Sequence, residues 1–251
     1  MSDVASVYVY GVTDAGADLV LDDHGLGPVR RVAVGGIAAL CTDVGDEPLG
    51  RRRELKAHAD VLSSACEQAA VVPLTFGTVL PDEEAVRARL LEPHAAHLEG
   101  ELDRLREVVQ FNLRLVPDEQ RLLADVVAGT PDLARLNDQV RRLPPGAGQA
   151  HRLRLGEAAA RAYRDAAARL GERVLQELRR SVADAEVEHV GSEEGATAAA
   201  LLVRRQDVSA FLAEVDRLAG GLDGRFTFRL VGPLPPFAFV RELPDLEAAW
   251  A

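Results

Sequence analysis

Apolar residues recur at every second position in some stretches of this chain and at every third or fourth position in others. No other sequence feature restricts the fold as strongly. The run VYVYGV at residues 7–12 alternates and is apolar on both faces, which predicts a central strand. Residues 51–69 have apolar positions at steps of three and four, which predicts an amphipathic helix: Leu55, His58 or Ala59, Leu62 and Cys66. Because both periods recur along the chain, the sequence predicts an α+β fold.

The composition is that of a globular chain with an aliphatic core. Of the 251 residues, 47% are hydrophobic but only 4% are aromatic, so Ala, Leu and Val must fill the interior. The net charge of −11 argues against a nucleic-acid partner and against loose attachment to an anionic membrane. No run approaches the ~18 apolar residues of a membrane span, and the N-terminus does not resemble a signal peptide. Cys41 and Cys66 lack metal-type spacing, which predicts two buried thiols in a reducing cytoplasm.

The first half of the chain contains a predicted hairpin and a segment in which a strand signal is followed directly by a helix start. Gly35 and Gly36 separate two β-type runs, which predicts a turn where both glycines have positive φ. The block VVPLTFGTVLPDEE follows at residues 71–84; its first six residues predict a short buried strand. Pro81 and the three acids after it are typical of a helix start, where the dipole favours negative charge.

The second half has the element order of a ferredoxin-like sheet with an additional helical segment. VVQFNLRLV at residues 108–116 predicts a half-exposed strand; two short helices and a long helix from about residue 151 to about 185 follow. Two strands, a helix that Asp207 can cap, and a last strand complete the order β-α-β-β-α-β. We therefore expect an N-terminal α+β domain of residues 1–116. A C-terminal ferredoxin-like domain of residues 117–251 would include the helical insertion and the C-terminal tail.

The sequence contains no familiar catalytic motif. It has neither G-x-x-x-x-G-K-[ST] nor G-x-G-x-x-G to hold a phosphate, and no G-x-S-x-G nucleophile elbow. His94, His97 and Glu101 could converge on one helix face as metal ligands, with His58 approaching from a neighbouring helix. No flanking motif supports a metal, so we favour surface or boundary positions for them and predict no metal, cofactor or catalytic residue. The arginines at 51–53 form either a solvated face or a docking patch for an acidic partner.

Two stretches carry a resemblance to a known family. They are HADVLSSACEQAAVVPLTFGTVLPDEEAVRARL at residues 58–90 and AALLVRRQDVSAFLAEVDRLAGGLDGRFTFRLVGPLPPFAFV at residues 199–240. With the opening YVYGV and the run IAALCTDV, they resemble the gas vesicle protein F/L family (GvpF/GvpL) over nearly the whole chain. The closing block of that family more usually reads G-P-W-P-P-Y-x-F, so Leu234 and Phe237 stand where Trp and Tyr are common.

The resemblance implies a cytoplasmic accessory or minor structural protein of gas vesicles. Such a protein binds the small hydrophobic shell protein and other accessory proteins during assembly, without enzymatic activity and without contact to nucleic acid or lipid membrane. We expect apolar surface to capture the shell protein while the surrounding negative charge keeps the complex soluble. The candidate contact residues are Leu74, Thr75, Phe76, Leu234, Phe237 and Phe239.

Two alternatives stay open at this point. The phenylalanines of the closing block, and Phe239 above all, could pack into the core instead of contacting a partner. A ferredoxin-like sheet also occurs in small-ligand-binding and catalytic proteins. That function would require a closed pocket with convergent histidine and acidic groups, whereas an open apolar surface favours the binding protein.

Overall fold

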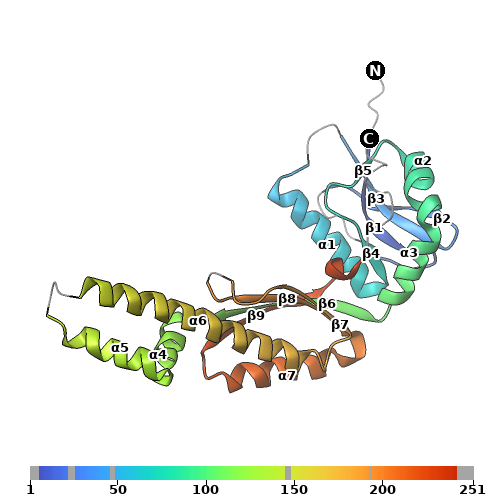
Figure 1. Cartoon of the computed structure of the whole chain (residues 1–251). Coiled ribbons are helices and arrows are strands. Elements are labelled where there is room, and N and C mark those ends of the chain that lie inside the picture. The colour runs from blue at the N-terminus through green and yellow to red at the C-terminus, as the bar shows by residue number, and fades with distance from the viewer. Residues whose placement is uncertain (1–5, 22–25, 46–48, 145–147, 193, 242–251) are drawn as a thin grey trace. The chain divides into compact units, whose positions relative to one another are not determined.

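The computed structural model describes residues 6–21, 26–45, 49–144, 148–192 and 194–241 (Figure 1). Its backbone contacts divide the chain into two compact units. Unit 1 comprises Met1–Gln110 and Pro233–Ala251, and unit 2 comprises Phe111–Gly232. Both units combine helices with a β-sheet, which confirms the predicted α+β fold.

The sheet of unit 1 is built around its first strand. β1 (Ser6–Asp14) lies between β3 (Ile37–Val44) and β4 (Val71–Pro73), and β2 (Arg30–Val34) pairs with β3 at the sheet edge. The short β5 (Val79–Leu80) also pairs with β1, and all of these pairs are antiparallel. Seven consecutive residues of β1 are buried, so the prediction of a central strand that is apolar on both faces is confirmed.

Two details of this sheet differ from the sequence prediction. The strand expected over residues 71–76 is shorter, because the chain turns after Leu74 and the Thr78 hydroxyl donates to the Thr75 carbonyl at 2.7 Å. In the hairpin between β2 and β3, Gly35 has a φ of 58°, but Gly36 does not have a positive φ. The turn therefore needs one left-handed glycine rather than two.

Unit 1 has two helical segments beside its sheet. α1 (Arg52–Gln68) follows β3, and the second segment consists of α2 (Glu83–Ala85), the π-helical η1 (Val86–Leu91) and α3 (Glu92–Leu105). The Asp82 carboxylate accepts a hydrogen bond from the Ala85 N–H at 2.7 Å, which confirms the predicted helix start. The widened π turn precedes Pro93, which has no N–H to donate to the carbonyl one turn earlier.

The two cysteines lie in the core of unit 1. Cys41 in β3 and Cys66 in α1 are buried free thiols, as predicted. Burial raises the pKa of Cys41 to about 12, so this thiol is protonated at neutral pH. No helix in the part of the chain that the structure describes has the length and apolar character to span a bilayer.

Unit 2 contains the second sheet. Its strands are β6 (Val108–Pro117), β7 (Asp184–His189), β8 (Thr197–Arg204) and β9 (Phe226–Leu234), arranged in the order β7-β8-β6-β9. The chain order is strand, helices, two strands, helix and strand, so both orders are consistent with a ferredoxin-like sheet. Since β6 starts and β9 ends in unit 1, these two strands carry the chain into unit 2 and back.

The helices of unit 2 are α4 (Glu119–Gly129), α5 (Pro131–Arg142), α6 (Gln149–Leu178) and α7 (Val208–Gly221). α6 ends earlier than predicted because the chain turns there toward β7. Asp207 does not cap α7 with its side chain, because it belongs to a preceding 3-10 turn, η2 (Arg205–Asp207). α6 and α7 both contact β8.

The contacts place the C-terminal segment differently from the predicted domain division. The predicted C-terminal domain spans residues 117–251, whereas the segment from Pro233 groups with unit 1. In this segment the Ala238 N–H donates to the Gln110 side-chain oxygen at 2.9 Å. Local sequence pattern does not show such contacts between distant segments.

A glycine of α6 sets how closely this helix approaches β8, and a second glycine of α6 serves as a control. A Cβ at Gly171 would lie 2.2 Å from Thr197 Oγ1, whereas one at Gly156 would meet nothing within 4 Å. We expect Gly171→Ala to lower the free energy of unfolding by about 1–3 kcal/mol, because buried Thr197 must move. Gly156→Ala should raise it by up to about 1 kcal/mol through helix propensity. Urea unfolding of both variants checks this, and equal stabilities would contradict the close approach.

Candidate protein-interaction site

An aromatic cluster in unit 1 surrounds the side chain of His58 in α1. The ring of Tyr10 stacks on the imidazole at 5.8 Å with an interplanar angle of 23°. Phe76 and Phe237 contact the imidazole at centroid distances of 5.7 and 6.1 Å, and Tyr8 lies at 5.8 Å. Four segments that are distant in sequence therefore meet at one histidine.

Two hydrogen bonds meet at the hydroxyl of Tyr8 in this cluster. Tyr8 Oη and His58 Nδ1 are 2.8 Å apart, and the Gly77 N–H donates to the same hydroxyl at 3.3 Å. Burial raises the pKa of Tyr8 to about 12, so the hydroxyl keeps its proton at neutral pH. The bond between Tyr8 and His58 joins β1 to α1.

Burial also keeps the imidazole of His58 neutral. Burial lowers the pKa of His58 to about 4. The nearby Leu74 backbone acts in the opposite direction and raises the pKa, but its effect is smaller than that of burial. Nε2 itself is buried and makes no hydrogen bond of standard geometry to the described residues. The side chains whose rings contact His58 are all aromatic, and none of them is acidic. This arrangement therefore lacks the carboxylate that orients a histidine acting as a general base.

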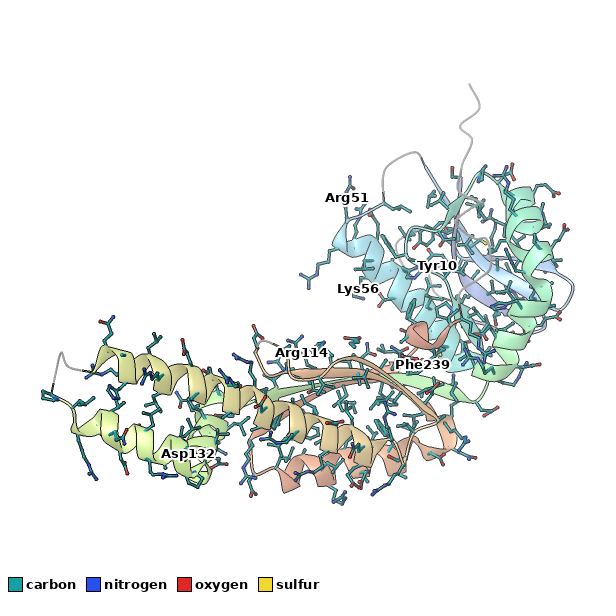
Figure 2. The ribbon with its side chains drawn as sticks, in the orientation of Figure 1. Tyr10, Arg51, Lys56, Arg114, Asp132 and Phe239 are labelled. Atoms are coloured by element: carbon teal, nitrogen blue, oxygen red, sulfur yellow. The ribbon has the colours of Figure 1, made fainter. Side chains whose placement is uncertain are left out.

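A buried ion pair on α3 holds the C-terminal segment in place beside this cluster. The Glu101 carboxylate accepts two hydrogen bonds from Arg104, at 3.1 and 2.6 Å, and one from the Arg241 N–H at 3.1 Å. Arg104 also donates to the Phe239 carbonyl. These bonds anchor the 3-10 turn η3 (Phe237–Phe239), in which Figure 2 labels Phe239.

The same arrangement explains the charge of Glu101. Burial alone would raise the pKa of this carboxyl, but the bonds from Arg104 and the Arg241 N–H outweigh it, so the pKa is lowered. Glu101 is therefore a carboxylate at neutral pH and is fully used in holding η3. His94 and His97 are not brought into a metal site with it, since the described residues contain no group of three potential metal ligands.

The predicted contact residues divide into buried and exposed ones. Leu74 and Phe239 are buried in the core, which is the alternative that the sequence left open for Phe239. Phe76 and Leu234 are half-buried and Thr75 is exposed. Phe237 keeps 42% of its surface exposed, although its ring contacts His58.

Sequence reasoning missed Leu55, which is 53% exposed one helical turn before His58. We had placed it on the buried stripe of α1. The buried face of the helix instead includes Glu54, whose carboxylate accepts hydrogen bonds from the Gly50 and Arg51 N–H groups at 2.8 and 2.7 Å. We take Leu55, Thr75, Phe76 and Phe237 together as the candidate contact residues and call them the Phe237 patch.

Basic side chains flank Leu55 on α1. The three arginines at 51–53 are exposed, and so is Lys56, which pairs with Asp60 at 2.5 Å. Figure 2 labels Arg51 and Lys56 at the start of the helix. Their exposure fits both a solvated face and a docking patch, and the apolar side chain of Leu55 lies beside them in the sequence.

Comparison with known proteins identifies the family. The sequence model of the family "Gas vesicle synthesis protein GvpL/GvpF" matches residues 6–241. The chain belongs to the GvpL/GvpF family. It is also 33% identical over 242 residues to "Gas vesicle protein F" from Streptomyces sp. (strain CB03234), a match that covers 94% of this chain and 99% of the relative. The resemblance found in the sequence is confirmed, and with it a role related to gas vesicles.

Two solved structures of the GvpL/GvpF family share the fold. The crystal structure of GvpF from Anabaena sp. PCC7120 superposes with a TM-score of 0.81 at 21% identity, covering 95% of this chain and 99% of the other. GvpF from Microcystis aeruginosa gives a TM-score of 0.70 at 18% identity, covering 95% and 100%. At these identities the likeness shows the fold alone.

The neutral state of His58 predicts a pH dependence of stability. Its pKa is about 4 in the folded chain and about 6.5 when unfolded, so folding lowers it. The stability contributed by the neutral ring is present above pH 6.5 and is lost as the pH falls toward 4, by about 3 kcal/mol. His58→Gln cannot titrate, so the difference in unfolding free energy between it and the parent should shrink by this amount between pH 7 and 4. A difference that stays constant with pH would contradict a buried neutral histidine.

The anchoring of η3 predicts a second effect. Arg104→Met leaves the buried Glu101 carboxylate without its main partner and should lower the free energy of unfolding by about 1–3 kcal/mol at pH 7. Because the pKa of Glu101 is lowered by folding, this cost should decrease as the pH falls below the usual glutamate range. The control Arg106→Met removes an exposed arginine that pairs with Asp14 and Asp103, and it should cost less than about 1 kcal/mol. Urea unfolding separates the two, and similar costs would show that Glu101 does not hold the segment.

Proposed function

We propose that this protein is a cytoplasmic accessory or minor structural protein of gas vesicles that binds the small hydrophobic shell protein through the Phe237 patch. The observation that carries the proposal is the exposed ring of Phe237, held over a buried imidazole. A rigid exposed aromatic side chain loses little conformational freedom on binding, which makes it suited to anchor an apolar partner.

The fixed position of the patch supports a binding role. The main-chain bonds of Arg104 and Gln110 hold η3, so Phe237 is presented by an anchored turn. Leu55 adds a second apolar side chain from α1, beside exposed basic residues. An apolar centre with a charged rim is the usual composition of a protein interface.

The proposed partners are the major shell protein first and other gas vesicle accessory proteins second. Family membership supports gas vesicle partners in general, and the negative net charge of −11 would keep a complex with an aggregation-prone subunit soluble. We assign no reaction to the protein, because the His58 cluster is aromatic and the buried Glu101 is used in holding η3.

A binding experiment tests this proposal. The purified full-length protein is immobilised and titrated with the major shell protein from the same gas vesicle system. We expect Phe237→Ser and Leu55→Ser each to weaken binding by about tenfold or more, because each removes an apolar contact. Phe237→Tyr should retain binding, since it keeps the ring and restores the side chain that the family more usually has.

The control variant is Leu212→Ser, which removes a comparably exposed leucine (39%) from α7 in unit 2. It should bind the shell protein as the parent does, and circular dichroism should show that all variants are folded. If the parent protein does not retain the shell protein, the proposed function is wrong. If the parent binds and the patch variants bind equally well, the function stands and the patch is wrong.

A further inference from the structure

The distal end of the α5–α6 pair in unit 2 has little core of its own. Only Leu133 is buried in α5, and the first buried residue of α6 is Ala167. The two helix ends lie close together, because a Cβ at Gly148 would be 2.3 Å from the Leu143 side chain. We call the described residues of 139–156 the arm tip.

The arm tip is basic in an acidic protein. Residues 139–156 contain four arginines and no Asp or Glu, so their net charge is +4. Because the whole chain has a net charge of −11, the rest of the chain carries −15. Among the described residues, no carboxylate lies within 4.0 Å of Arg141, Arg142 or Arg154. The nearest acids in sequence are Asp138 and Glu157, outside the tip. The charges of Arg141, Arg142 and Arg154 are therefore not neutralised by a described carboxylate within this distance.

An apolar side chain lies among these charges. Leu153, between Arg152 and Arg154, is 63% exposed, although a leucine gains most when it is covered. Exposed arginines around an exposed leucine match an acidic segment that also presents an apolar side chain.

We infer that the arm tip is a docking site for an acidic amphipathic segment of a protein partner. The charge distribution favours a short segment over a long polyanion. A nucleic acid or an anionic membrane would extend beyond the tip and meet the −15 carried by the rest of the chain. A short segment interacts mainly with charges within the screening length of about 8 Å at physiological salt.

The test measures binding of a fluorescent helical peptide in which glutamates flank a leucine stripe, and of a version with lysines in place of the glutamates. The tip variant Arg142→Glu/Arg154→Glu is compared with the charge-matched control Arg89→Glu/Arg229→Glu, whose exposed arginines lie outside the tip. Fluorescence anisotropy is recorded with the full-length protein at low and physiological salt.

We expect the glutamate peptide to bind at least about tenfold more tightly than the lysine peptide, and the tip variant to lose about tenfold in affinity. The control should lose less than about twofold, and Leu153→Ser should weaken binding without changing its salt dependence. Unchanged binding by the tip variant, or equal binding of the two peptides, would overturn the inference. Tighter tip-dependent binding of a single-stranded oligonucleotide or of phosphatidylserine vesicles would also overturn it, in favour of a polyanion site.

Discussion

The buried Glu101–Arg104 pair determines how unit 1 is completed. Through Arg104 and the Glu101 carboxylate, α3 binds the main chain at Phe239 and Arg241, which lie 135 or more residues further along the sequence. These bonds supply partners to the Phe239 carbonyl and to the Arg241 N–H, and leaving such part-buried polar groups without partners is costly. Together with the bond from the Ala238 N–H to Gln110, this interaction holds η3, in which Phe237 contacts His58.

Several polar groups buried in unit 1 bond to one another or to the main chain. Tyr8 bonds to His58, and the Glu54 carboxylate accepts from two N–H groups at the start of α1. Among the exposed side chains, unit 1 presents the apolar Leu55 and Phe237, and the arm tip of unit 2 presents arginines around Leu153. The two proposed docking surfaces would select partners of different kinds.

Local pattern predicted the elements well and their assembly less well. The strand β1 and the helices α1 and α7 follow directly from hydrophobic period. The exposure of Leu55 could not be predicted in this way, because Glu54 and His58 occupy buried positions through partners that periodicity does not reveal. The return of the C-terminal segment to unit 1 depends on the Arg104 and Gln110 side chains, whose partners lie far away in sequence.

The division of unit 1 between the two ends of the chain has a consequence for biosynthesis. A ribosome makes residues 1–110 first, then all of unit 2, and only then the segment that carries Phe237. The Phe237 patch therefore cannot be completed until the segment that carries Phe237 has been synthesised. A chain that ends before Pro233 contains all five strands of the unit 1 sheet, but it lacks the aromatic ring that lies over His58.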